Sequence, residues 1–158
     1  SLMSLAETFA LVSFSIFSYA DLRYRLVPGI EVFLFGTILL TFPATPIQTG
    51  IVLLACIWSI FRNLSGWFAI PLLFYPPVWP VLFTGYGYRK SIIGRADLLA
   101  ISGLACLFPL PAVLLSLLGL ELWRRLWIRR QQGNIPALPG LLLGLIVYLL
   151  LRLFLPTP

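Results

Sequence analysis

Four long stretches without a charged residue constrain this chain more than any other feature of its sequence. They cover residues 32–61, 63–88, 98–120 and 131–151. About 20 consecutive apolar residues are enough for a helix to cross the hydrocarbon core of a bilayer. With 60% hydrophobic residues, 10% charged residues and a mean hydropathy of +1.01, the composition is typical of integral membrane proteins and not of soluble domains.

In lipid, only helices and closed barrels satisfy every backbone hydrogen bond, and no long strand-like alternation is present. We therefore expect an all-α integral membrane protein, in which residues 1–158 form a single polytopic domain of about six short transmembrane helices. Residues 1–18 lack a basic start and a small-residue cleavage site, so we expect a retained first helix instead of a secretory signal. The expected helices cover residues 3–20, 30–43, 47–61, 92–108, 110–123 and 138–155, with "FPATP" and "FPLP" as tight turns.

Segment 64–84 contains four prolines and is the one long apolar stretch that cannot form a regular helix throughout. It either spans the bilayer or enters and returns. If it returns, ten of the eleven basic residues lie on one side of the membrane, as expected for the cytoplasmic side, and only Arg152 lies opposite. This bias favours a re-entrant or interfacial segment, with the N-terminus outside and Asp21 and Asp97 both at the cytoplasmic face.

Composition also excludes several classes of chemistry. Histidine is absent, which excludes Ser-His and Cys-His catalysis and removes the commonest metal ligand. Cys56 and Cys106 lie in apolar stretches and indicate neither a disulfide framework nor a metal site. The net charge of +6 comes from residues at the ends of apolar segments, so we expect no nucleic-acid partner. We also expect no metal and no cofactor.

The segment "ELWRRLWIRRQQ", residues 121–132, alternates arginines with tryptophan and aliphatic residues. This pattern is typical of an anchor at the cytoplasmic membrane interface, where arginine meets lipid headgroups. A substrate-docking role is the alternative.

Five acidic residues are present, and each needs a reason in a chain of this hydropathy. Glu7, Glu31 and Glu121 are expected to have structural or interfacial roles. Asp21 closes the first expected helix, just before Val27, Pro28 and Gly29 end the segment, and Asp97 opens the fourth, with Gly94 allowing close backbone approach just before it.

Two aspartates at one membrane face are sufficient for acid–base activation of water. When two carboxyls are close together they do not both ionise, so one holds a proton while the other accepts one from the attacking water. Helix dipoles predict that Asp97, near a helix N-terminus, holds more of the negative charge, and that Asp21, near a C-terminus, holds more of the proton. Two interfacial aspartates paired with nearby arginines are the alternative. Arg23 and Arg25 either stabilise the Asp21 carboxylate or act as positive charges that mark the cytoplasmic side.

The segment "DLRYRLVPG" (21–29) resembles the D-x-R-x-x-x-I-P-N motif of prepilin peptidases, a family of intramembrane aspartic proteases. "GRAD" (94–97) resembles the second aspartyl motif of that family, Gly-x-Gly-Asp, in the relaxed form of its archaeal branch. "NIPALPGLLLG" (134–144) resembles the I-P-F-x-P-x-L-x-x-G opening of its last helix. The matching positions are the catalytic candidates Asp21 and Asp97 and the supporting residues Arg23, Arg25, Pro28, Gly94, Ala96 and Pro136.

The resemblance implies an endopeptidase that removes short basic leaders from prepilins or pre-archaellins at the cytoplasmic face of the cell membrane. Its partners would be these precursors and the lipid bilayer. Gly29 replaces the usual Asn, Ala96 fills the third position of Gly-x-Gly-Asp, and the four-cysteine loop of many bacterial relatives is absent, so their N-methyltransferase activity is not implied.

Two alternatives stay open. A protease of the presenilin or signal peptide peptidase kind shares Gly-x-Gly-Asp, but its partner motif places tyrosine directly before aspartate, whereas here Ala20 separates Tyr19 from Asp21. A non-catalytic scaffold or small transporter subunit would use Asp21 and Asp97 as an ion relay or a structural pair.

Overall fold

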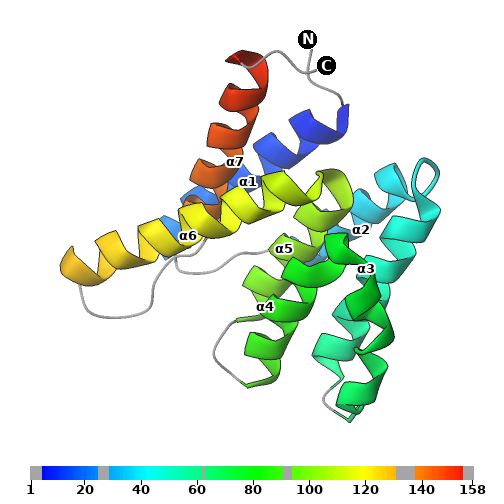
Figure 1. Ribbon diagram of the computed structural model, residues 1–158. Helices are drawn as coiled ribbons and strands as arrows, with labels where there is room; N and C mark the ends of the chain where they lie inside the picture. Colours follow the sequence, from blue (N-terminus) through cyan, green and yellow to red (C-terminus); the bar gives the residue numbers. More distant parts are fainter. Residues whose placement is uncertain (1–4, 25–28, 62, 91–93, 131–137, 155–158) are drawn as a thin grey trace. The chain divides into compact units, whose positions relative to one another are not determined.

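The computed structural model describes residues 5–24, 29–61, 63–90, 94–130 and 138–154 (Figure 1). All regular secondary structure in these ranges is helical. The chain divides into two compact units, one built from residues 1–28 and 111–158 and the other from residues 29–110. We call them unit 1 and unit 2. The single polytopic domain expected from the sequence stays a prediction.

The described residues of unit 1 form three helices. Of these, α1 and α7 run antiparallel along each other. The helices are α1 (Leu5–Tyr24), α6 (Leu110–Arg130) and α7 (Leu138–Phe154), with α6 starting one residue before the unit boundary. The direction follows from two contacts: Glu7 in the first turn of α1 reaches Arg152 in the last turn of α7, and Asp21 near the end of α1 reaches Leu138 at the start of α7.

Helices α6 and α7 approach each other closely at three glycines. A Cβ built on Gly144 would lie 2.2 Å from the Leu115 carbonyl oxygen, and one built on Gly119 would lie 2.5 Å from the Gly140 carbonyl oxygen. Gly140 and Gly144 are four residues apart and therefore lie on one face of α7. This Gly-x-x-x-Gly spacing permits backbone-to-backbone packing of helices, which lipid favours because apolar burial drives no association there.

Unit 2 is organised around α5 (Arg95–Leu107), which packs against α2, α3 and α4. Residues 98–106 of α5 are all buried. The unit contains α2 (Ile30–Thr41), α3 (Pro46–Ile60), the 3₁₀ helices η1 (Gly66–Phe68), η2 (Pro71–Phe74) and η3 (Pro76–Val78), α4 (Trp79–Arg89) and α5.

Prolines set several of the helix boundaries in unit 2. Pro46 occupies the first turn of α3, where its missing N–H costs nothing. Phe108 is extended because Pro109 follows it, and this ends α5. Both expected turns, "FPATP" and "FPLP", lie between helices as predicted, although Pro46, Leu110 and Pro111 already belong to the helices that follow.

The six helix positions expected from the sequence are confirmed, since each range overlaps one α-helix. Helix α6 is longer than expected and continues to Arg130, so the basic segment from residue 121 to 130 is helical. No helix in the described residues combines the length and the apolar character needed to cross a bilayer. This finding differs from the expectation of six transmembrane helices: α2, α3 and α5 have only 12 to 15 residues, and α1 and α6 carry charged residues.

The proline-rich segment 64–84 forms a chain of short helices instead of one long helix. Pro71 opens η2, Pro76 opens η3, and Pro80 occupies the first turn of α4. Helix α4 was not expected. It forms because Pro80 is tolerated in a first turn and no proline follows before Arg89. Whether the segment is re-entrant or interfacial stays a prediction.

The contact between Glu7 and Arg152 gives Glu7 a structural function, one of the two kinds of role expected for it. Arg152 Nη1 donates to Glu7 Oε1 at 2.6 Å and Nη2 donates to Oε2, a bidentate pair with side chains only 15% (Glu7) and 25% (Arg152) exposed. Such a pair fixes the orientation of two planar groups as well as neutralising them.

Glu7→Gln is expected to lower the free energy of unfolding by about 2–3 kcal/mol, somewhat less than the 3–5 kcal/mol of a fully buried pair, because it leaves the Arg152 charge without its partner. The Glu7→Gln, Arg152→Met double variant removes both charges and should recover most of that loss. Thermal unfolding in detergent measures both. A double variant as unstable as the single one would contradict the ion-pair explanation.

Candidate functional site

Asp21 lies in the last turn of α1, with its side chain half-buried. Its Oδ2 accepts a hydrogen bond of 3.3 Å from the backbone N–H of Leu138, the first residue of α7. The first four N–H groups of a helix have no partner within the helix, and a carboxylate there satisfies one of them. Asp21 therefore caps α7, a contact 117 residues apart in the chain.

This contact changes the expected distribution of charge. The sequence placed Asp21 only near the C-terminus of its own helix, which disfavours a carboxylate. The N-terminus of α7 acts in the opposite sense, and its N–H donor stabilises the ionised form of the carboxyl. The helix dipoles therefore no longer assign the proton to Asp21.

Asp97 is the third residue of α5 and is also half-buried. It lies in the first turn, where the helix dipole favours a negative charge. The next residue, Leu98, is fully buried in unit 2. Asp97 therefore lies at the boundary between the exposed first residues of α5 and its buried part.

Asp21 belongs to unit 1 and Asp97 to unit 2. Each half of the candidate site is thus defined within its own unit, at a helix end, with a partly exposed carboxyl. That the two carboxyls meet stays a prediction.

Gly94 has open surroundings among the described residues. It precedes the first turn of α5 with φ −79° and ψ 162°, a conformation open to any residue. A Cβ built there would meet nothing within 4 Å. The expectation that Gly94 permits close backbone approach stays a prediction. Ala96 is half-buried in the first turn of α5.

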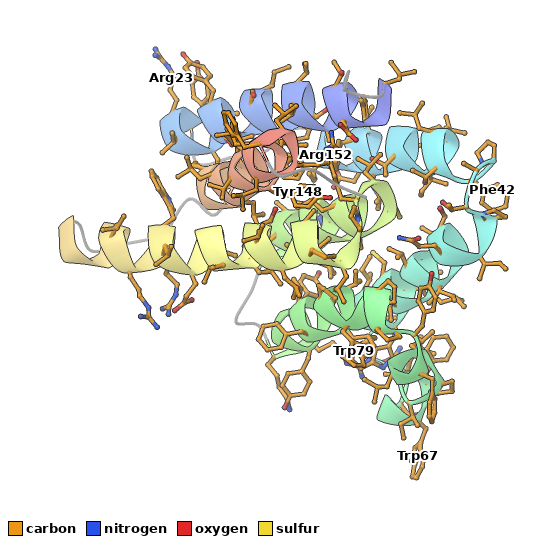
Figure 2. All side chains as sticks on the ribbon, turned by 45° about the horizontal axis from the view of Figure 1, so that its top comes forward. Arg23, Phe42, Trp67, Trp79, Tyr148 and Arg152 are labelled. Carbon is orange, nitrogen blue, oxygen red and sulfur yellow. The ribbon has the colours of Figure 1, made fainter. Side chains whose placement is uncertain are left out.

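Arg23 is exposed and contacts two tyrosines of its own helix. Its Nη1 donates to the Tyr19 hydroxyl at 3.3 Å, and its guanidinium carbon lies 5.6 Å from the centre of the Tyr24 ring. In Figure 2 its side chain projects from the surface of α1. Arg25, Pro28 and Pro136 lie outside the described residues.

An ion pair that the sequence did not predict lies beside Asp97. Arg95, two residues before Asp97, contacts Glu31 of α2 with its Nη2 2.7 Å from Oε1. Both side chains are more than half exposed, so the pair contributes little to stability. It marks the place where the first turns of α2 and α5 are close together.

Glu121 organises the start of the basic segment of α6. Its carboxyl accepts hydrogen bonds from Arg124 and Arg125, one turn further along the helix. These two guanidinium groups lower the pKa of Glu121 to about 2. Glu121 thus stays ionised at any physiological pH and offsets part of the positive charge of the segment.

Comparison with protein-family models, with curated proteins and with solved structures found no significant match to this chain. The resemblance to prepilin peptidases therefore depends on the residues of the three motifs and on their placement in the helices.

Metal chemistry has no visible support in the part of the chain that the structure describes. No three His, Cys, Asp or Glu side chains gather there in a group that could hold an ion. The contact between Asp21 and Leu138 was also not predicted, and nothing in the local sequence of either residue indicates it.

Proposed function

We propose that this chain is an intramembrane aspartic endopeptidase that removes short basic leaders from prepilin-like or pre-archaellin precursors at the cytoplasmic membrane face. The observation that carries the proposal is the hydrogen bond from Leu138 to Asp21. It joins a segment that resembles the first motif of prepilin peptidases, residues 21–29, to one that resembles their last, residues 134–144. Contact between two motif-like segments that are far apart in the sequence supports the resemblance more than either segment does alone.

A bilayer location is supported by the apolar side chains that the helices expose. On α2, Val32, Phe35 and Leu39 are each more than 60% exposed, and α1 exposes Leu5 and Ile16 to a similar degree. Water disfavours such surfaces, and lipid does not. Apolar helices shorter than the hydrocarbon core are accommodated by local thinning of the bilayer or by oligomerisation.

The proposed chemistry follows the two-carboxyl pattern of aspartic proteases. One of Asp21 and Asp97 accepts a proton from a bound water as the water attacks the scissile carbonyl. The other, protonated at that stage, donates to the leaving amine as the tetrahedral intermediate breaks down. The two carboxyls titrate as a unit, so the resting proton belongs to the pair.

A second candidate function is a non-catalytic membrane scaffold, and one observation favours it. The bond from Leu138 to Asp21 stabilises the start of α7, which by itself is a sufficient reason for an aspartate at this position. In this case Asp97 would stabilise the first turn of α5, in which it lies.

The proposal is tested with the purified chain in lipid nanodiscs and synthetic precursors that carry a short basic leader before a hydrophobic helix. We expect mass spectrometry to detect cleavage between leader and helix. A matched precursor whose leader arginines and lysines are replaced by serine serves as the control and should be cleaved more slowly. No cleavage of pilin, archaellin or sugar-binding-protein precursors by a folded sample would favour the scaffold.

A further inference from the structure

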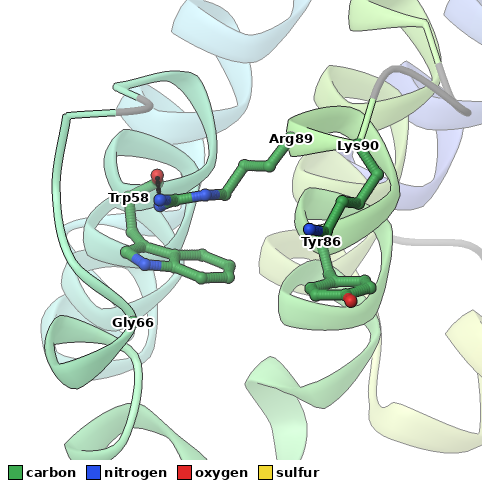
Figure 3. Close-up of a pocket in the computed structure, with 5 residues that line it drawn as sticks. All are labelled: Trp58, Gly66, Tyr86, Arg89 and Lys90. Carbon is green, nitrogen blue, oxygen red and sulfur yellow. Dashed lines mark hydrogen bonds between the residues drawn. The ribbon is translucent and has the colours of Figure 1, made fainter.

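A cavity of about 310 Å³ in unit 2 lies between the end of α3, the start of η1 and the end of α4 (Figure 3). It is lined by Trp58, Gly66, Tyr86, Arg89 and Lys90. Two of these side chains are cations and two are aromatic. Tyr86 and Lys90 are exposed, so the cavity opens to the surface.

Arg89 is held in place by two backbone carbonyls and an aromatic ring, among other contacts. Its Nη1 donates to the carbonyl oxygen of Trp58 at 2.8 Å, and its Nη2 donates to that of Leu64 at 2.6 Å. Its guanidinium carbon lies 4.6 Å from the centre of the Trp58 ring, and Figure 3 shows the side chain extending from α4 over the indole. The carbonyl and ring contacts orient the guanidinium.

Lys90 supplies a second positive charge next to the first. Its Nζ lies 5.6 Å from the centre of the Tyr86 ring. It is the single lysine in the sequence. An oriented guanidinium beside a mobile ammonium, in a concave site, favours a compact anion with several oxygen acceptors, and a phosphate group has this chemistry.

The surroundings of the cavity indicate where such a phosphate comes from. Trp67, next to the lining residue Gly66, is 78% exposed, and Phe74 of the same unit is 86% exposed. Figure 2 shows Trp67 projecting away from unit 2. Exposed tryptophan and phenylalanine near cations are typical of a surface that inserts at the boundary between lipid headgroups and acyl chains.

We propose that this cavity binds the phosphate of an anionic phospholipid headgroup, while the neighbouring exposed aromatic side chains contact the acyl region. Arg89 supplies the fixed cation and Lys90 the adjustable one. The proposal shares only the membrane location with the proposed function, and requires no peptidase activity.

The test uses native mass spectrometry of the full chain released from nanodiscs of phosphatidylcholine, with or without phosphatidylglycerol. We expect wild-type protein to retain phosphatidylglycerol, and Lys90→Gln to lower the apparent affinity about fivefold, the effect of one basic residue at an anionic surface. Arg95→Gln, which removes an exposed cation elsewhere in unit 2, is the control and should retain the lipid. Arg89→Gln should lower the affinity for phosphatidylglycerol further. Because this variant also removes the hydrogen bonds to the Trp58 and Leu64 carbonyls, Lys90→Gln is the decisive variant.

Equal loss in Lys90→Gln and Arg95→Gln, or equal retention of phosphatidylcholine and phosphatidylglycerol, would overturn the proposal. Glycerol 3-phosphate is added in a separate experiment to distinguish a lipid from a free phosphate compound. Displacement of phosphatidylglycerol only at high excess supports the lipid. Tight binding of glycerol 3-phosphate that Lys90→Gln abolishes would show instead that the site takes a soluble ligand. Loss of leader cleavage alone, with lipid retention unchanged, bears on the proposed function and not on this site.

Discussion

Replacing either Asp21 or Asp97 with asparagine is expected to reduce leader cleavage by about 10²–10⁴-fold, because an amide neither accepts a proton from the attacking water nor donates one to the leaving amine. Each variant should show the loss by itself, since the two carboxyls act as one unit. The measurement is the initial rate of leader release at saturating precursor.

The contact between Asp21 and Leu138 allows this experiment to separate catalysis from folding. Asparagine keeps an oxygen that accepts the hydrogen bond from the Leu138 N–H, so Asp21→Asn should unfold at nearly the wild-type temperature. Asp21→Ala removes that acceptor and should lose about 1 kcal/mol of stability as well as activity.

The matched control is Glu121→Gln, the same chemical change in an exposed ion pair of α6. It should cleave at the wild-type rate. Substantial leader cleavage by Asp21→Asn or Asp97→Asn would rule out the two-aspartate mechanism. Loss of activity only in Asp21→Ala, together with lowered stability, would show that Asp21 acts as a cap of α7 and not as a proton relay.

Gly144→Ala is expected to destabilise unit 1 by about 1–3 kcal/mol, although alanine is the better helix former by about 1 kcal/mol. The added Cβ would lie 2.2 Å from the Leu115 carbonyl oxygen and 2.5 Å from the Ser116 Cα. Both are backbone atoms of α6 and cannot rotate away as a side chain can. Helices α6 and α7 must therefore separate, and their packing along the whole crossing weakens.

Gly50→Ala is the matched control, since Gly50 also lies within a helix and a Cβ there meets nothing within 4 Å. It should raise the stability by about 0.5–1 kcal/mol through helix propensity alone. Thermal unfolding of the two variants in the same detergent compares them directly. If Gly144→Ala raised the unfolding temperature as Gly50→Ala does, the close crossing of α6 and α7 would be wrong.

The helices were predictable because their boundaries are local. Prolines at 43, 46 and 109 interrupt the hydrogen bonding of any helix that reaches them, whatever lies around it. Helix α4 was missed for a related reason: four prolines within 64–84 indicated a broken segment, but the tolerance for Pro80 depends on its place in a first turn.

The candidate site was predictable only as residue types at helix ends. Asp21 and Asp97 stood out because a chain with five acidic residues has few reasons to keep them beside apolar segments. The surroundings of Gly94 could not be predicted, because a glycine before a helix has the same local sequence whether its backbone is crowded or open.

The sequence alone determined the helical class, the helix positions and the short list of residues able to carry charge, because hydropathy, proline and charge act on near neighbours in the chain. The tertiary structure decided the partners: Asp21 with Leu138, Glu7 with Arg152, Gly144 with Leu115, and Arg89 with Trp58. The first two contacts join residues more than 100 positions apart. Such partners depend on which helix faces pack together. The sequence of an apolar helix does not distinguish the face that packs from the others.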